Sequence, residues 1–482
     1  MKNTYDLVLI GARFPQLALG ALLSKRGHSV LIVDQHRHPA PFTEEPIDGY
    51  LFRRRPAPLS GLDSDGFLGH FLNEIGIGRV LVSKSYPSNP VSYQVVLPRH
   101  RINVYQKREY LLEEISREFP HYIDPFREVY SQMDALTEKW FENFSSISSL
   151  ESIRYSLAGF REQTSGIRQT RQLKPVLKQF EGTGSEADFL NVQSHILGGC
   201  PVNGLPGTLS AALIHRIGRR GTFQEPVGTT SLTDLMLTRF QEFGGEILSG
   251  RAMDIKNIPG SKMSIILEDG SNVEASCLST TSDIAKHIKG LVRKSNTKTH
   301  RDSSARVPVR FYLGIDEAVI PLGMEDNLFL LREDEGGPLG IKILYLALSP
   351  AGSSMSPEGR RSLTVTALVE KKILETLNDE MIQEAEQDIL IPLETVIPFL
   401  HDGLNLFKSD LADSTGEKAP RPLRGEIMSW IPALVGRGRI WTLRRGRVAV
   451  MTLPPWELGL EGETLSAIAA AGSMRKHLEK GK

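Results

Sequence analysis

The sequence predicts an α/β fold, and three features near its start carry this prediction. Residues 5–10 form an apolar run of strand length that ends at Gly11. Residues 17–25 have a helical pattern, and residues 29–33 form a second apolar run before Asp34. A strand, a turn, a helix and a second strand that ends on an acid are typical of a Rossmann-like dinucleotide-binding unit. In such a unit a pyrophosphate lies at the helix N-terminus, and the acid binds the ribose hydroxyls.

The turn of this unit keeps only the first of the three glycines in the G-x-G-x-x-G fingerprint. It reads Gly11, Ala12, Arg13, Phe14, Pro15 and Gln16. The second glycine normally lets the backbone approach the pyrophosphate, and the third lets the helix pack closely on the strand. Arg13 either pairs with a phosphate or fills the pocket and excludes the nucleotide. Gln16 adds bulk, so we expect the helix to stand slightly away from the sheet.

Length and charge narrow the class of protein. The chain has 482 residues, more than one ordinary core contains, so we expect two intertwined domains. The 57 basic and 57 acidic residues balance, which argues against a nucleic-acid partner. The two cysteines, Cys200 and Cys277, form no ligand pattern, and we expect structural thiols and no metal site. No paired-carboxylate or Ser-His-Asp spacing identifies a catalytic residue.

Helical patterns recur along the rest of the chain. We expect helices at residues 67–75, 108–144 with a break at Pro120, 231–243, 370–386 and 463–478, with others between 145 and 222. The helix at 231–243 is followed by Gly244 and Gly245, a typical C-terminal signal.

Strands are expected in two groups. They cover residues 91–97, 102–105, 246–258, 263–268, 272–279, 307–315, 341–348 and 362–369. The dipeptide Asp269-Gly270 predicts a hairpin turn between two of them.

Several segments together resemble the phytoene desaturase type of FAD-dependent oxidoreductase, within the amine-oxidase-like flavoprotein superfamily. After the βαβ unit, residues 48–52 read D-G-Y-L-F, similar to that family's D-G-[FY]-x-F segment. Residues 226–229 read P-V-G-T before a helix, where the family has P-x-G-G. Residues 346–350 and 356–359 resemble the family's strand and its following loop. These motifs follow one another in the family's order over nearly the whole chain.

The departures from the family pattern concentrate on the cofactor. Near the C-terminus the family has a strand, then Gly-Asp, then a glycine-rich turn into the last helix. Here Met451 and Thr452 stand about where Gly-Asp is expected, while Gly459 and Gly462 are kept. The family's Gly-Gly turn after the ribose acid is also absent between residues 35 and 46. Both halves of the expected site have changed, which suggests altered or abandoned flavin binding.

The resemblance implies an α/β architecture with a Rossmann-like FAD/NAD(P)-binding domain and a second, mixed-sheet substrate domain capped by helices. The first domain would comprise residues 1–80, 220–300 and 435–482, and the second residues 81–219 and 301–434. FAD would contact Gly11, Ala12, Arg13, Phe14, Gln16, Asp34, Gln35, Arg37, Gly228, Met253, Met451, Thr452, Gly459 and Gly462.

Two functions follow from the resemblance. The first is an FAD-dependent oxidoreductase that acts on an apolar substrate, such as an isoprenoid or another lipid-like molecule. The second is a noncatalytic descendant that has lost FAD and binds a partner or an apolar ligand. The Rab escort and GDP-dissociation-inhibitor proteins set a precedent for the second within the superfamily, although none of their specific motifs occurs here.

Location is inferred from apolar and basic segments. The first apolar run is short and enters a strand, so we expect no signal peptide and no spanning helix. Residues 286–310 and 437–447 are rich in lysine and arginine. Each such charge adds about 1 kcal/mol close to an anionic membrane surface. We therefore expect a cytoplasmic protein, either free or peripheral at the inner face of a membrane.

Overall fold

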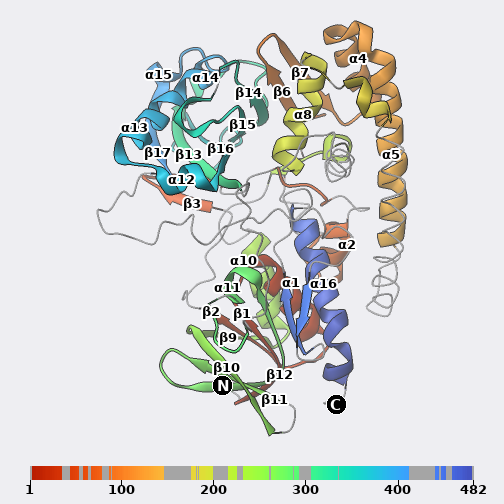
Figure 1. Ribbon diagram of the computed structural model, residues 1–482, viewed down its shortest axis with the longest axis vertical. Coiled ribbons are helices and arrows are strands. Elements are labelled where there is room, and N and C mark those ends of the chain that lie inside the picture. The colour runs from red at the N-terminus through yellow and green to blue at the C-terminus, as the bar shows by residue number, and fades with distance from the viewer. Residues whose placement is uncertain are drawn as a thin grey trace.

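Two large sheets organise the computed structural model, one in each lobe of the molecule (Figure 1). The structure describes residues 3–34, 44–53, 58–62, 67–78, 86–87, 90–145, 175–180, 182, 184–198, 215, 217–224, 232–259, 262–285, 287–291, 306–334, 336–411, 440–443, 447–451 and 459–479. The lobe that contains both chain ends holds the first sheet, and the second sheet lies above it in Figure 1.

Five parallel strands form the centre of the first sheet. In order they are β19 (Val448–Met451), β12 (Asn272–Thr281), β1 (Thr4–Ile10), β2 (Val30–Asp34) and β9 (Glu246–Ser249). β10 (Ala252–Ile258) and β11 (Lys262–Leu267) extend the sheet antiparallel from β12, and β18 (Ile440–Leu443) pairs with β19. Because the five strands are parallel, their carboxyl ends meet at one edge. That edge faces the second lobe, since β1 starts near the far end of the molecule (Figure 1).

The two faces of the first sheet are covered differently. Leu7 and Leu9 of β1 pack against α1 (Phe14–Lys25), α10 (Leu232–Glu242), α16 (Gly459–Leu478) and α2 (Phe67–Glu74). Val8 and Ile10 point to the opposite face, towards β10, β11 and α11 (Ser282–Ala285). The strand is apolar on both sides because both faces are buried, which is why it reads as a continuous run instead of an alternating one.

The second sheet is mostly antiparallel. Its order is β17 (Leu404–Ser409), β13 (Arg306–Asp316), β16 (Arg360–Glu370), β15 (Ile343–Leu348), β14 (Asn327–Leu331), β6 (Val91–Leu97) and β7 (His100–Tyr105), with only β14 and β6 parallel among these pairs.

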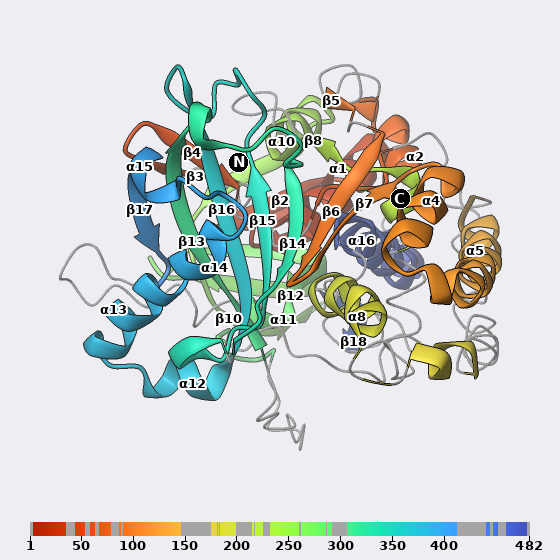
Figure 2. The ribbon, with the colours of Figure 1, turned by 90° about the horizontal axis from the view of Figure 1, so that it is seen from above.

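Helices cover both faces of the second sheet (Figure 2). Phe329 and Tyr345 pack towards α4 (Arg108–Glu118), α5 (Ile123–Ser145) and α8 (Ser185–Gly198). Leu328 and Leu344, their neighbours in the strands, pack towards α12 (Lys371–Thr376), α13 (Asp379–Asp388), α14 (Leu390–Glu394) and α15 (Leu400–Gly403).

The smaller elements complete the described structure. They are the strand pairs β3 (Glu44–Ile47) with β4 (Tyr50–Arg53) and β5 (Tyr86–Pro87) with β8 (Phe223–Gln224), and 3-10 turns at Pro120–Tyr122, Lys178–Phe180, Glu317–Val319 and Gly337–Leu339.

The predicted fold class is confirmed, and two of the predicted elements are wrong. Residues 246–258 form two strands, because the chain turns after Ser249 and the Gly250 N–H donates to the Asp34 carbonyl. Residues 370–386 form two helices, because the Asn378 side chain accepts the Met381 N–H and starts α13 anew. The division into domains stays a prediction.

Candidate functional site: the carboxyl edge of the parallel sheet

Asp34 is tied to the turn that follows β1. The Ala12 N–H donates to Asp34 Oδ2 at 2.6 Å, and the Gly11 N–H donates to the Val33 carbonyl at 2.8 Å. Asp34 is buried, with 8% of its surface exposed. Gly11 has φ +92, a left-handed conformation that favours glycine, so the kept glycine is the one that the turn requires. The acid at the end of β2 is therefore oriented by the dinucleotide turn itself.

The N-terminus of α1 opens at the same edge. Arg13 is the N-cap residue with extended backbone, and its side chain does not cap the helix. Phe14, partly buried, packs on the core beneath. No acid lies in the first turn of α1, and the nearest carboxylate described is that of Asp34, which accepts the Ala12 N–H just before the helix. Pro15 carries no N–H and removes one donor from this end.

Gln16 is completely buried where the fingerprint would have its third glycine. Its Nε2 lies 3.5 Å from the Ile10 carbonyl, and its Oε1 has no hydrogen-bond partner among the described residues. The close approach of α1 occurs one turn later, at Gly20, where a Cβ would lie 3.0 Å from Leu9 Cδ1 and 3.1 Å from the Phe240 ring. The helix is therefore kept near the strand by a glycine displaced by four positions.

α16 brings a second helix N-terminus to this edge. Met451, fully buried, ends β19 in register with Thr281 of β12. Gly459 is the first residue of α16 and Gly462 lies in its first turn. α16 packs along α1, and it runs from the carboxyl edge down to the C-terminus (Figure 1). The Thr281 Oγ1 is buried and has no partner within the described part of the chain.

Met253 lies near the same end of the sheet. It is the second residue of β10, 37% exposed, and its carbonyl accepts the Lys289 N–H at 3.0 Å. Gly250, three residues earlier, donates to the Asp34 carbonyl at 2.8 Å. A contact between Met253 and a nucleotide stays a prediction.

Four of the predicted cofactor residues fall outside the described residues: Gln35, Arg37, Gly228 and Thr452. Most of the two basic segments also falls outside them. The remaining ten of the fourteen are placed by the structure. All of them except Met253 belong to the turn, to the start of α1, to the end of β2 or β19, or to the start of α16.

Three residues of this edge have no place in the sequence prediction. Ile284 of α11 covers the turn, since a Cβ on Gly11 would lie 2.4 Å from Ile284 Cδ1. Gly20 and Thr281 are the others. The only sequence signals for them are a glycine within a helical pattern and a hydroxyl at the end of an apolar strand, and neither signal is specific.

The adenosine and pyrophosphate half of a dinucleotide fits these residues. Two buried oxygens at this edge, Gln16 Oε1 and Thr281 Oγ1, have no hydrogen-bond partner among the described residues. Asp34 stands at the end of β2, where the ribose acid belongs. The part of the chain that would meet the flavin ring, around Thr452, lies outside the described residues.

Other chemistry finds little support in the described residues. They hold no group of three or more His, Cys, Asp or Glu side chains that could bind a metal ion. Burial raises the pKa of the Cys277 thiol to about 12, which is consistent with the predicted structural role. Among the residues that the structure describes, no helix is long and apolar enough to cross a membrane.

Comparisons with known proteins find similar structures but no similar family model or curated sequence. No protein-family model matches the chain, and no curated protein matches it. A putrescine oxidase triple mutant redesigned in cofactor binding is similar over 99% of this chain and 98% of its own, with a TM-score of 0.60 and 13% identity. Cyclohexylamine oxidase from Brevibacterium oxydans is similar over 98% and 99%, with a TM-score of 0.60 and 14% identity. A Rab GDI from Plasmodium falciparum is similar over 85% and 89%, with a TM-score of 0.50 and 13% identity.

The described part of the chain therefore has the fold of these two amine oxidases. At these identities the likeness establishes the fold, and the function has to be argued from the site.

Proposed function

We propose that this protein is an FAD-dependent oxidoreductase of the amine-oxidase-like superfamily. The observation that carries the proposal is the bond from Ala12 to Asp34, which holds an acid at the carboxyl edge beside the N-terminus of α1. The full-length likeness to two amine oxidases supports it.

The residues at this edge would divide the binding of FAD between them. Asp34 would accept hydrogen bonds from the ribose hydroxyls. The first backbone amides of α1 would face the pyrophosphate, and those of α16 would face the flavin. When bound, FAD would supply the redox chemistry, that is, the capacity for hydride transfer that no side chain provides. The chain itself would position the cofactor at the carboxyl edge, which faces the second lobe (Figure 1).

The substrate is proposed at a coarser level. The sequence resemblance favours an apolar substrate of the phytoene desaturase type, whereas the similar structures are oxidases named for putrescine and for cyclohexylamine. Anaerobic loss of flavin absorbance on addition of each compound class separates the two. Bleaching by the amines alone would assign amine oxidation, and bleaching by a polyene alone would assign the desaturase type.

The first test is the absorbance spectrum of the purified protein, with and without added FAD. Flavin bands that stay with the protein through gel filtration are expected. A colourless protein that takes up no FAD would overturn the proposal.

A noncatalytic role is the second candidate, and the arginine and glutamine in the turn favour it. Arg13 stands where the backbone normally meets the pyrophosphate, and Gln16 stands where the helix normally packs closely on the strand. A Rab GDI also shares much of the fold. Failure to take up FAD would favour this role.

A further inference from the structure

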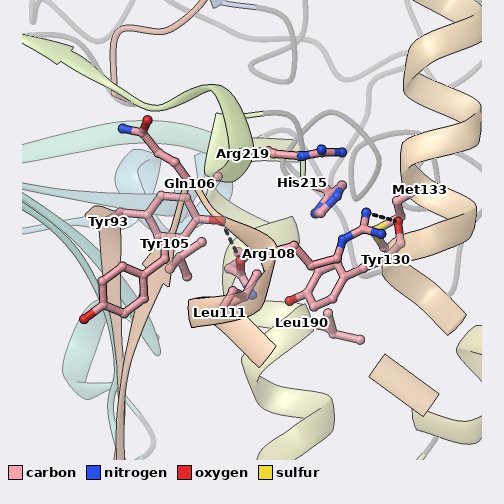
Figure 3. A pocket seen from close by; sticks show the side chains of 13 residues that line it. Tyr93, Tyr105, Gln106, Arg108, Leu111, Tyr130, Met133, Leu190, His215 and Arg219 are labelled. Carbon is pink, nitrogen blue, oxygen red and sulfur yellow. Dashed lines mark hydrogen bonds between the residues drawn. The ribbon is translucent and has the colours of Figure 1, made fainter. Parts of the chain in front are cut away.

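The pocket between β6, β7, α4, α5 and α8 is too small for an organic ligand. Its volume is about 20 Å³, room for about one or two water molecules (Figure 3). Asp134 of α5 already pairs with its polar side chains, since Oδ2 is 2.8 Å from Arg219 Nη1 and Oδ1 is 2.8 Å from His215 Nε2. The same carboxylate contacts Arg108 Nη2. This pocket therefore holds nothing larger than water.

The outer surface of the second lobe, in contrast, exposes three large apolar side chains. Leu322 is fully exposed, Phe399 is 65% exposed and Ile391 is 59% exposed, the three highest values among the large apolar residues that the structure describes. Leu322 follows the 3-10 turn Glu317–Val319, Ile391 belongs to α14, and Phe399 is the N-cap residue of α15. A single exposed apolar side chain is ordinary, whereas several on neighbouring elements mark a contact surface.

The elements that carry these side chains are packed on one another. α15 contacts the 3-10 turn, and a Cβ on Gly403 would lie 2.7 Å from Val319 Cγ1. Val319, Leu390 and Leu400 belong to the same apolar core beneath the surface. Figure 1 shows α13, α14 and α15 around the outer end of the second lobe, on the side away from the first sheet. The three exposed side chains therefore belong to one surface.

Leu322 is held outward by a tight turn. The Met324 N–H donates to the Pro321 carbonyl at 3.1 Å, and Gly323 has φ +87, which the third position of a type II turn requires. Gln94 Nε2 donates to the Gly323 carbonyl at 3.2 Å and anchors the turn to β6. Because the turn already fixes the position of Leu322, a partner that binds there has little backbone left to order.

The surroundings of the three apolar side chains are acidic. Residues 311–331 contain four acidic residues and residues 373–407 contain eight, and neither stretch contains a lysine or an arginine. Arg332, Arg360 and Arg361 pair with three of these acids. The exposed acids without an ion-pair partner among the described side chains are Glu317, Asp379, Glu380, Glu384 and Asp402. This surface is therefore negative, although the charges of the whole chain balance.

We propose that this surface binds a basic, amphipathic segment of a partner protein. Its apolar side chains would contact Leu322, Phe399 and Ile391, and its lysines or arginines would face the surrounding acids. Charge complementarity selects this partner, because the same acids repel an acidic protein or an anionic membrane. An apolar centre with a polar rim is also the usual arrangement of a protein interface. The proposal does not depend on the proposed flavin function.

The test is fluorescence anisotropy with three labelled peptides of equal length. The first has leucines at helical i, i+3 and i+4 spacing among lysines. The second replaces every lysine with glutamate, and the third has the composition of the first in an order that breaks the apolar stripe. The first is expected to bind at least about tenfold more tightly than either of the others, the equivalent of roughly 1.4 kcal/mol. Equal binding of either control peptide, or no binding of the first, would overturn the proposal.

A matched pair of double variants locates the site. Leu322→Ser with Glu317→Lys removes one exposed apolar side chain and reverses one exposed acid of the proposed surface. Tyr110→Ser with Glu109→Lys makes the same kind of change on α4, where both side chains are also exposed. A loss of about tenfold in affinity for the lysine peptide is expected in the first variant alone. An equal effect in both variants would refute the assignment.

Two further measurements address the alternative occupants of this surface. Gel filtration over a range of protein concentrations reports on a second copy of the chain, and co-sedimentation with phosphatidylserine vesicles reports on a membrane. We expect neither self-association nor vesicle binding that the change of Leu322 and Glu317 abolishes. Either result would assign the surface to that occupant and overturn the proposal of a basic protein partner.

Discussion

Asp34 Oδ2 accepts the Ala12 N–H at 2.6 Å, so the end of β2 is fastened to the turn that follows β1. A similar bond closes the opposite end of the same two strands, where the Asp6 Oδ2 accepts the Ser29 N–H at 2.8 Å. The two carboxylates play the same structural part, but only Asp34 lies at the carboxyl edge. Variants of the two aspartates can therefore be compared to distinguish an effect on the stability of the βαβ unit from an effect on ligand binding.

Asp34→Ala should abolish FAD binding and also destabilise the protein. The Ala12 N–H would lose its buried acceptor, which costs about 1–3 kcal/mol in the free energy of unfolding. Flavin content after dialysis and denaturant unfolding measure the two effects. The assigned ribose site is wrong if the variant keeps its flavin.

Asp6→Ala is the matched control for this experiment. It removes the corresponding acceptor at the amino end, where the Asp6 side chain is 32% exposed. We expect a smaller loss of stability and unchanged FAD binding. Loss of flavin in both variants would mean that Asp34 acts only through the fold.

The sequence was sufficient to predict the fold class because both sheets follow from local patterns. Continuous apolar runs mark the parallel strands, and Asp269-Gly270 marks the hairpin between β11 and β12. The break at residues 377–378 was missed, since a single Asn378 cap interrupts an otherwise helical pattern. β14 and β17 were missed as well.

The site was less predictable than the fold. The βαβ layout and the spacing from Gln16 to Asp34 predict that the acid lies beside the turn, and the Ala12 N–H does donate to Asp34 Oδ2. Ile284 contacts the turn although it is far from Gly11 in the sequence. It lies there only because β12, which precedes it, pairs with β1. The bond pattern of Gln16 depends equally on tertiary packing, because a buried amide reads in sequence like any polar helix residue.

Arg13→Gly combined with Gln16→Gly should raise FAD affinity while lowering stability. The change restores both missing glycines and removes Gln16 Oε1, which has no partner among the residues that the structure describes. A glycine within a helix costs about 1 kcal/mol, so the free energy of unfolding should fall. Fluorescence titration with FAD measures the expected gain in affinity, and denaturant unfolding measures the expected loss of stability.

Arg26→Gly is the control for this double variant, because it removes an arginine from the other end of the same helix. It should leave FAD affinity unchanged. If the double variant gains no affinity over the wild type, then Arg13 and Gln16 do not obstruct the site.

Gly11→Ala should destabilise the protein through two separable effects. The positive φ of +92 costs about 1–3 kcal/mol for a residue with a Cβ, and that Cβ would lie 2.4 Å from Ile284 Cδ1. Adding Ile284→Ala should recover the part that is due to the clash and leave the backbone strain. Denaturant unfolding of both variants measures this, and full recovery would show that the strain is negligible.

His215 should make the protein less stable in mild acid. Burial, and then Arg108 and Arg219, lower the pKa of the folded imidazole to about 3, whereas the unfolded one takes up its proton near pH 6.5. Between these values only the unfolded state is protonated, so the free energy of unfolding falls as the pH falls. The slope is at most about 1.4 kcal/mol per pH unit, and it ends near the folded pKa.

His215→Gln should remove this contribution, while His401→Gln, which changes an exposed histidine, should keep it. Denaturant unfolding of the three proteins at about pH 7 and about pH 5 measures the difference. Asp134 Oδ1, 2.8 Å from His215 Nε2, favours the protonated imidazole. The same carboxylate also pairs with the guanidinium groups of Arg108 and Arg219, which weakens this effect. The opposite outcome is a wild-type protein whose free energy of unfolding rises from about pH 7 to about pH 5, while that of His215→Gln does not. It would show that the attraction of Asp134 outweighs burial and the two arginines, and that the folded imidazole is charged.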